Sequence, residues 1–371
     1  MRIGCPKEIK NQEYRVGLTP AAVREATASG HDVMIEAGAG TGAGFPDQAY
    51  VDAGAAIIDT AEQIFAEADM IVKVKEPQPG ERKMLREGQI LFTYLHLAPD
   101  PAQTKDLLES GCTAIAYETV TDRNGGLPLL APMSEVAGRL APQVGAWTLQ
   151  KANGGRGVLM GGVPGVSPSK VAVIGGGVVG ANAAKVAAGM GADVTILDMS
   201  LPRMRYLDEV FGGRVKTRYA SKDATEEEAF AADLVIGAVL VPGAAAPKLI
   251  SAEQIKGMKP GAAIVDVAID QGGCFETARA TTHDDPIYIV DDVVHYCVAN
   301  MPGAVARTST IALGNATMPF FMAIANKGWK QACIDDPHLA EGLNTHAGQL
   351  TYFAVGQALG MDVISPKLVL R

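Results

Sequence analysis

The chain lacks the features that mark membrane, nucleic-acid-binding and metal-binding proteins. No apolar run approaches the roughly 20 residues that a membrane-spanning helix needs, so we expect no membrane partner. Positive charge is not in excess, because 32 Lys and Arg residues face 41 Asp and Glu residues. The resulting net charge of −9 argues against a nucleic-acid partner, whose phosphates need a basic face. The six histidines form no HExxH or related pattern, and we expect no metal site.

Cysteine is scarce and follows no pattern. The five cysteines include no CxxC pair, and their odd number argues against a complete disulfide framework. They are Cys5, Cys112, Cys274, Cys297 and Cys333. The first eight residues are charged and interrupted by Pro6, whereas a signal peptide has an apolar core. We therefore expect reduced thiols and a cytoplasmic location.

The remaining composition is that of an ordinary globular protein. Of the 371 residues, 48% are hydrophobic and 20% are charged. A chain of this length is long for one hydrophobic core, so we expect two domains. The sequence contains no internal repeat and no low-complexity tail.

A glycine-rich turn between apolar runs predicts a dinucleotide-binding unit. Residues 171–174 suit a buried parallel strand, and residues 178–190 suit a small-residue helix that packs against a sheet. Gly175 permits the turn, Gly177 lets the backbone approach a pyrophosphate, and Gly180 permits close helix–strand packing. The helix N-terminus adds N–H groups and partial positive charge that suit a phosphate. The ordinary alternative is a packing turn without a ligand.

Asp198 ends the next predicted strand, about 20 residues beyond the glycine turn. An acid at this spacing holds the ribose 2′-hydroxyl, which favours NAD over NADP. Arg203 and Arg205 follow closely, and an arginine in this region can instead hold a 2′-phosphate. We expect NAD, and the alternative for Asp198 is a surface aspartate.

Short β-like runs alternate with helical ones along most of the chain. This alternation predicts an α/β fold with two Rossmann-like, doubly wound parallel-sheet domains. The N-terminal runs are residues 2–5, 31–36, 70–75, 89–96 and 112–118. In the second domain a six-strand sheet is completed after Asp198 by residues 214–219, 234–237, 262–267 and 287–290.

The C-terminal part is predicted to be helical, through residues 315–327 and again from about 339 to 359. A long helix there would return the chain to the first domain. We therefore expect a discontinuous substrate and catalytic domain, 1–130 plus 306–371, and an NAD-binding domain, 131–305, joined by long helices.

Polar residues at the carboxyl ends of strands are candidate site residues, because open parallel sheets bind ligands there. Lys75 and His96 close two strand runs, and Asp270 follows a strand of the second domain. Such a histidine can act as acid or base, and such an aspartate near a nicotinamide can orient water or accept a proton. The ordinary alternative for His96 is a core histidine. For Lys75 it is a solvated strand lysine, and Lys73 on the same strand face partly supports this alternative. Asp266, inside its run, is expected to be a structural carboxylate tied to the backbone or a cap.

Arg15 lies in a polar loop before the first predicted helix, which Thr19 caps and Pro20 begins. Its planar guanidinium could clamp a carboxylate through two charge-assisted hydrogen bonds. On spacing alone, a solvated arginine is the better interpretation.

Six stretches together resemble the alanine dehydrogenase family along essentially the whole chain. They are residues 4–20, 72–77, 93–98, 161–165, 266–279 and 298–303. The resemblance implies that Arg15 and Lys75 bind the substrate carboxylate and carbonyl, and that His96 and Asp270 form the catalytic pair. It also implies NAD contacts at Ser134, Val178, Asp198, Arg203, Val239, Leu240, Val267, Arg279, Val298, Asn300 and Met301.

The reaction implied by this resemblance is the reversible oxidative deamination of L-alanine with NAD to pyruvate and ammonium. The resemblance further implies a homohexamer. Two alternatives stay open: the NAD-binding component of proton-translocating nicotinamide nucleotide transhydrogenase, which needs no amino-acid pocket, and a catalytically silent NAD-binding protein. Lys75, His96 and the motif at residues 300–303 favour the dehydrogenase over the first, and four intact candidate positions argue against the second.

Overall fold

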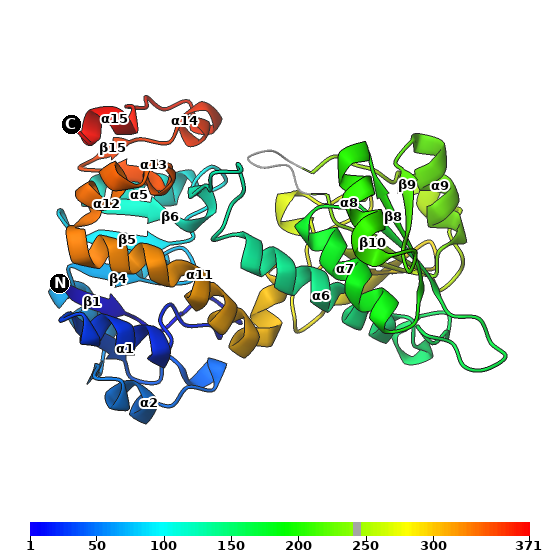
Figure 1. The fold of residues 1–371 in the computed structure, drawn as a ribbon, viewed down its shortest axis with the longest axis horizontal. Helices are drawn as coiled ribbons and strands as arrows, with labels where there is room; N and C mark the ends of the chain where they lie inside the picture. The colour runs from blue at the N-terminus through cyan, green and yellow to red at the C-terminus, as the bar shows by residue number, and fades with distance from the viewer. Residues whose placement is uncertain (240–245) are drawn as a thin grey trace. The chain divides into compact units, whose positions relative to one another are not determined.

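The chain divides into two compact units, one of which is discontinuous in sequence. In the computed structural model, which describes residues 1–239 and 246–371, the first unit is Met1–Met133 with Val305–Arg371, and the second is Ser134–Ala304. In Figure 1 the blue-to-cyan and orange-to-red parts of the chain accordingly share one unit. The chain enters the second unit within helix α6 (Ala131–Thr148) and leaves it just before helix α11 (Ala306–Lys327).

The first unit is built on a mostly parallel sheet of eight strands among the described residues, in the order β15-β14-β6-β5-β4-β1-β2-β3. The strands are β1 (Arg2–Cys5), β2 (Asp32–Glu36), β3 (Ala56–Ile58), β4 (Met70–Val72), β5 (Ile90–Thr93), β6 (Thr113–Ala116), β14 (Leu343–His346) and β15 (Gln349–Leu350). Strands β1 to β6 are parallel in the doubly wound order 3-2-1-4-5-6, and β14 and β15 add an antiparallel edge.

The prediction of a continuous helix over about residues 339–359 is wrong. That stretch begins with the last two residues of helix α13 (Pro337–Ala340), continues through β14 and β15, and is helical again only in α14 (Phe353–Leu359). Leu343, Asn344 and Thr345 are buried where β14 pairs with β6, so tertiary pairing decides this segment's conformation rather than local preference. Strand β3 is too short for a periodicity signal and went unpredicted.

The second unit has a seven-stranded sheet in the described part of the chain, ordered β12-β13-β11-β10-β7-β8-β9. The strands are β7 (Lys170–Ile174), β8 (Asp193–Asp198), β9 (Lys216–Tyr219), β10 (Leu234–Gly237), β11 (Ala263–Asp266), β12 (Ile287–Val290) and β13 (Val293–Tyr296). Leaving β12 aside, the sheet is parallel in the same doubly wound order. The predicted fold class, two Rossmann-like α/β domains, is confirmed.

The sixth parallel strand is β13, and the expectation that residues 287–290 supply it is wrong. Strand β12 instead pairs antiparallel with β13 across a two-residue turn, Asp291 and Asp292. Both turn residues have positive φ, 47° and 61°, as the tightest hairpin turns require. Asp-Asp is a weaker turn signal than Asn-Gly, which explains why the hairpin was not predicted.

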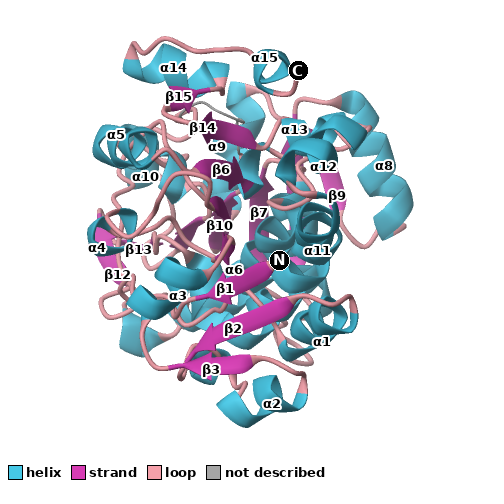
Figure 2. Cartoon of the chain, turned by 90° about the vertical axis from the view of Figure 1, so that its left-hand side faces the viewer, coloured by secondary structure: helices cyan, strands magenta, loops and turns pink. Residues whose placement is uncertain are grey.

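Helices cover both faces of the first sheet. Figure 2 shows α1 and α11 on one side of the first sheet and α3 and α5 on the other. The helices of the first unit, besides α11 and α14, are α1 (Pro20–Ala28), α2 (Asp47–Asp52), α3 (Ala61–Glu67), α4 (Pro79–Arg82), α5 (Pro101–Ser110), α12 (Trp329–Asp335), α13 (Pro337–Ala340) and α15 (Pro366–Val369). Those of the second, besides α6, are α7 (Val178–Gly189), α8 (Leu201–Phe211), α9 (Lys222–Ala231) and α10 (Ala252–Lys256). Thr19 caps α1 as predicted, because its hydroxyl accepts the Ala22 N–H at 3.2 Å.

A buried ion cluster lies directly after β4, at Lys73. The lysine is fully buried, and its Nζ lies 2.7 Å from Glu81 Oε1 and 3.1 Å from Glu8 Oε2. Burial acts to lower the pKa of Lys73, but the charges of Glu8 and Glu81 outweigh it and raise that pKa. Lys73 is therefore buried and paired, and it gives no support to the alternative that Lys75 is a solvated strand lysine.

We expect Lys73→Met to lower the free energy of unfolding by about 3–5 kcal/mol, because two carboxylates would stay buried without their counter-charge. Urea unfolding followed by circular dichroism measures the change. Lys105→Met, which breaks an exposed pair with Glu109 on α5, is the matched control and should change stability by less than about 0.5 kcal/mol. Equal unfolding midpoints for the two variants would contradict a stabilising role of Lys73.

Candidate functional site

The glycine turn of the second unit is shaped by steric limits that its sequence predicts. Gly175 follows β7 with φ +102°, and α7 begins at Val178 with Gly177 as its N-cap. A Cβ at Gly180 would lie 1.8 Å from the Gly175 carbonyl oxygen, so only glycine permits this helix–strand contact. A Cβ at Gly177 would meet no described atom within 4 Å. Gly180 thus serves packing, whereas internal packing does not require Gly177.

Two charged side chains of opposite sign hold this turn from β8 and α8. Asp198 accepts the N–H groups of Gly176 and Ser200, each at 2.7 Å. Arg203 donates from Nε to the Gly176 carbonyl at 2.5 Å and from Nη2 to the Gly177 carbonyl at 3.3 Å. Its guanidinium also lies 4.8 Å from the centre of the Tyr206 ring. Asp198 and Arg203 therefore both act on the backbone of the glycine turn.

Asp270 lies in a short 3₁₀ turn (Ile269–Gln271) after β11, and its side chain is exposed. The fully buried Asp266 holds this loop by accepting the N–H groups of Ala268 at 3.1 Å and Cys274 at 2.8 Å. Burial raises the pKa of Asp266 to about 6, against the backbone N–H groups that act to lower it. The prediction that Asp266 is a structural carboxylate tied to the backbone is confirmed.

Lys248 also holds this loop, through carbonyl groups of the loop backbone. Its ammonium donates to the carbonyls of Gly272 at 2.5 Å, Gly273 at 3.0 Å and Phe275 at 3.1 Å. An acid on N–H groups and a lysine on carbonyls thus fix the backbone that carries Asp270. The sequence contained no signal for Lys248, because it does not end a predicted strand run.

The other residues predicted to contact NAD lie in the second unit, on α6, at the start of α7 and on loops beyond β10, β11 and β13. They are Ser134, Val178, Val239, Val267, Arg279, Val298, Asn300 and Met301. Leu240, also predicted, lies outside the described residues. Asn300 has φ +60°, and its carbonyl oxygen lies 3.2 Å from Nε2 of His283. The Arg279 guanidinium lies 4.0 Å from the centre of the Tyr288 ring.

Arg15 is buried in the first unit rather than solvated. Glu13 holds its guanidinium in two hydrogen bonds, 2.7 Å to Nε and 2.6 Å to Nη2, and Nη1 lies 3.0 Å from Met133 Sδ. Burial acts to lower the pKa of Arg15, but the hydrogen bonds and charge of Glu13 outweigh it, so the net pKa shift is upward. A charged, oriented guanidinium is thereby kept away from bulk water.

Lys75 lies just beyond β4, in a loop whose backbone is held by the buried Glu8. Glu8 Oε1 accepts the N–H groups of Val74 at 2.6 Å and Lys75 at 3.3 Å. The Lys75 carbonyl in turn accepts the Thr93 hydroxyl at 2.9 Å, which joins the loop to the end of β5. The lysine is partly buried.

His96 lies just beyond β5, with 44% of its side chain exposed. Its ring is parallel to that of Tyr94, with interplanar angle 4° and centroids 5.8 Å apart. The Tyr94 hydroxyl donates to the Leu129 carbonyl at 2.5 Å, and burial raises the pKa of Tyr94. The alternative interpretation of His96 as a buried core histidine is therefore wrong.

The sheet of the first unit brings the loops of Arg15, Lys75 and His96 together at the carboxyl ends of its strands. Strand β4 pairs in parallel with both β1 and β5, so the loops after these strands are neighbours at their carboxyl ends. Asp270 lies at the carboxyl end of β11 in the other unit. Sequence reasoning missed the acids that hold these loops, Glu8, Glu13 and Glu118. Glu118 could have been found, because it ends the run at 112–118 just as Lys75 and His96 end theirs.

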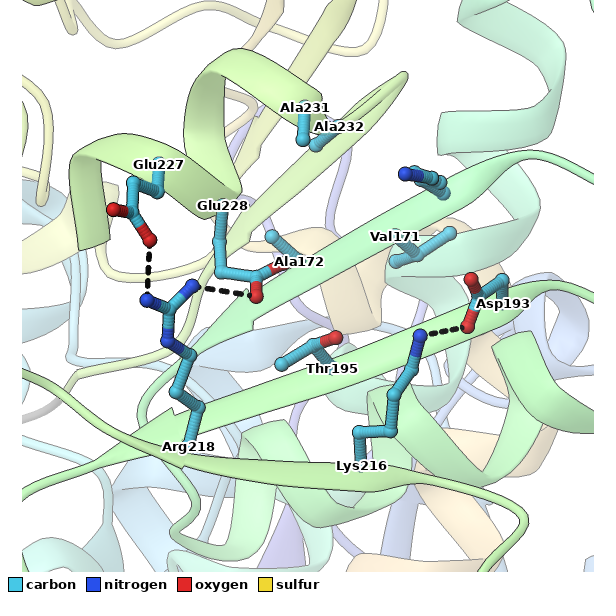
Figure 3. Close-up of a pocket in the computed structure, with 11 residues that line it drawn as sticks. Val171, Ala172, Asp193, Thr195, Lys216, Arg218, Glu227, Glu228, Ala231 and Ala232 are labelled. Atoms are coloured by element: carbon cyan, nitrogen blue, oxygen red, sulfur yellow. Dashed lines mark hydrogen bonds and ion pairs between the residues drawn. The ribbon is translucent and has the colours of Figure 1, made fainter. Parts of the chain in front are cut away.

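A polar hollow in the second unit does not coincide with these residues. Figure 3 shows it along β7, β8 and β9, where Lys216 is paired with Asp193 and Arg218 with Glu227 and Glu228. Asp193 and Lys216 are the first residues of their strands. The hollow therefore lies toward the amino ends, away from the glycine turn.

Within residues 1–239 and 246–371, no three His, Cys, Asp or Glu side chains are grouped so that they could hold a metal ion. In the same ranges, no helix is long and apolar enough to cross a membrane.

Comparisons with known proteins agree over both units. The family described as "Alanine dehydrogenase/PNT, N-terminal domain" matches residues 4–137, and its C-terminal counterpart matches residues 141–353. The chain is 60% identical over 364 residues to an alanine dehydrogenase of Halomonas elongata, covering 98% of each chain. It is 56% identical over 370 residues to an alanine dehydrogenase of Mycobacterium tuberculosis, covering 100% of each.

Solved structures agree with the sequence comparison. A structure of an L-alanine dehydrogenase has a TM-score of 0.94 at 53% identity, covering 97% of this chain and 99% of that one. A transhydrogenase from Sinorhizobium meliloti has a TM-score of 0.82 at 26% identity, covering 95% of this chain and 100% of that one. The chain belongs to the alanine dehydrogenase/PNT family.

Proposed function

We propose that the protein is an NAD-dependent alanine dehydrogenase. It catalyses the reversible reaction of L-alanine, NAD⁺ and water to pyruvate, ammonium and NADH. The observation that carries this proposal is the grouping of Arg15, Lys75 and His96 on neighbouring loops, in a chain 60% identical to an alanine dehydrogenase. The first unit is accordingly the substrate and catalytic domain, and the second is the NAD-binding domain.

The residues at the glycine turn fit NAD. The N-terminus of α7 and the open space at Gly177 suit a pyrophosphate, which backbone N–H groups and the helix dipole would hold. The Asp198 carboxylate accepts hydrogen bonds from two backbone N–H groups. Because a carboxylate has about four lone-pair sites, it can also accept hydrogen bonds from the ribose hydroxyls. Arg203 would have to leave the carbonyls of Gly176 and Gly177 to hold a 2′-phosphate, which favours NAD over NADP.

The remaining NAD contacts follow the family resemblance. They are Ser134, Val178, Val239, Leu240, Val267, Arg279, Val298, Asn300 and Met301. NAD, when bound, supplies the two-electron acceptor for oxidation at Cα of alanine.

The chain's own side chains bind the substrate and move protons. Arg15, kept charged and oriented by Glu13, binds the substrate carboxylate. Oxidation of alanine leaves an imine at Cα, and Lys75 stabilises the oxygen that forms there when water adds. The C–N bond of the resulting carbinolamine then breaks, which releases ammonia and leaves pyruvate. His96 is the acid and base that exchanges a proton with the reacting nitrogen or oxygen, and Asp270 orients the attacking water and takes the second proton.

The assembly and setting of the enzyme are proposed on the family resemblance together with the composition. We propose a homohexamer that works in the cytoplasm in the breakdown of L-alanine. The five cysteines are all buried and unpaired, in keeping with a reducing compartment.

A steady-state screen of L-alanine, serine, glycine and 2-aminobutyrate with NAD and NADP, without membranes, tests the proposed reaction. We expect the highest kcat/KM for L-alanine with NAD, and formation of pyruvate and ammonium. Activity only with a second nucleotide as acceptor would point to the transhydrogenase component instead. NAD binding without turnover of any amino acid would identify a catalytically silent protein.

His96→Ala and Asp270→Asn should each lower kcat by about 10²–10⁴, the range expected when general acid–base catalysis is lost. Steady-state kinetics with saturating L-alanine and NAD measures the change, and NAD titration confirms that the cofactor still binds. His31→Ala and Asp285→Asn are matched controls that should keep normal turnover. Normal turnover in either test variant would remove that residue from the mechanism.

Asp198→Ala should lower the ratio of kcat/KM for NAD over NADP by about 10-fold or more, because the ribose hydroxyls would lose a charge-assisted acceptor. The control is Asp193→Ala, at the opposite end of the same strand, where the carboxylate is paired with Lys216. An unchanged ratio in the Asp198 variant would count against a ribose contact.

A further inference from the structure

The backbone of His96 has a conformation that a histidine seldom adopts. Its φ is +51°, in the left-handed region that side chains with a Cβ rarely enter. The residue lies just beyond the end of β5 at Thr93, so the N–H groups of Leu95 and His96 are outside the strand ladder. Such a conformation persists only where surrounding contacts hold it.

Glu118 supplies these contacts. Its Oε1 accepts the His96 N–H at 2.6 Å and the Leu95 N–H at 3.1 Å, and its Oε2 lies 3.2 Å from the Leu95 nitrogen. Glu118 lies in a 3₁₀ turn (Tyr117–Thr119) directly after β6, the parallel neighbour of β5. Its side chain is only 15% exposed, a setting in which charge-assisted hydrogen bonds are strong.

The imidazole ring is held by a different residue. Nδ1 of His96 lies 3.8 Å from Glu118 Oε1, which is too far for a hydrogen bond. The ring instead stacks on Tyr94, whose hydroxyl is anchored on the Leu129 carbonyl. Glu118 therefore acts on the peptide of His96, and Tyr94 acts on its ring.

We propose that Glu118 is a positioning residue for catalysis. Its carboxylate holds the left-handed peptide of His96 and so places the imidazole where it exchanges protons with the substrate. This inference rests on the proposed catalytic role of His96. When the carboxylate is removed, the peptide relaxes and the ring moves, and a displacement on the order of 1 Å can cost about 10²-fold in rate.

Two substitutions of Glu118 distinguish the effect of its hydrogen bonds to the peptide from the effect of its negative charge. Glu118→Ala removes both acceptors, and we expect kcat to fall about 10- to 100-fold while NAD affinity stays within twofold. Glu118→Gln keeps Oε1, which by itself lies within reach of both N–H groups, and we expect kcat within about fivefold of the unsubstituted enzyme. The control is Glu109→Ala on α5, whose carboxylate forms an exposed pair with Lys105.

A double-mutant cycle with His96→Ala tests whether Glu118 acts through His96. We expect Glu118→Ala to cost less than about twofold in kcat in the His96→Ala background, because no imidazole is left to position. Turnover is followed at high enzyme concentration, since His96→Ala is slow. Thermal unfolding of every variant shows whether the fold is kept, and a purely structural role would lower Tm without a loss of kcat in the folded fraction.

Three results would overturn the proposal: normal kcat in Glu118→Ala, an equal loss in Glu118→Gln, or a loss that persists in the His96→Ala background. If His96→Ala is slow and Glu118→Ala is normal, the proposed role of Glu118 fails and the catalytic role of His96 stands. If His96→Ala itself turns over normally, the catalytic role of His96 fails, and the basis of the inference fails with it.

Discussion

The loops that carry the candidate residues depend on carboxylates that accept backbone N–H groups. Glu8 accepts those of Val74 and Lys75, and Glu118 accepts those of Leu95 and His96. Where a strand ends, the next N–H groups lose their ladder partners, and each one left unsatisfied in a buried position costs about 1–3 kcal/mol. A carboxylate satisfies two such groups at once with charge-assisted bonds, and thus fixes a loop without secondary structure.

In the second unit, too, carboxylates that accept backbone N–H groups hold the loops. Asp198 holds the glycine turn, and Asp266 holds the loop of Asp270. For Lys75, His96 and Asp270, a separate acid close in space sets the local backbone, whereas Asp198 holds the glycine turn and is also the proposed ribose contact. A reactive side chain therefore need not supply its own support and can keep its polar atoms for ligands. These carboxylates are buried or partly buried, which disfavours their charged form, and for Asp266 burial accordingly raises the pKa.

Strong local signals made much of this arrangement predictable from the sequence. In the glycine turn, Gly175 has a positive φ, and Gly180 makes a contact that leaves no room for a Cβ. Both constraints require glycine and are therefore visible in the sequence. The strand-end rule located Lys75 and His96. It did not reveal Glu13 or Lys73, because a buried salt bridge leaves no periodicity, and charged residues in loops are usually solvated.

By itself, the sequence determined the α/β class, the glycine turn and the strand ends that carry Lys75, His96 and Asp270, because steric and periodic constraints act over a few neighbouring residues. Only the tertiary structure decided the conformation of residues 343–350, the antiparallel placement of β12 and the pairing of Glu118 with the His96 peptide. Each of these depends on a strand or side chain far away in the sequence or on a turn with a weak local signal. Hydrogen bonds formed across the fold, rather than local preference, then set the conformation.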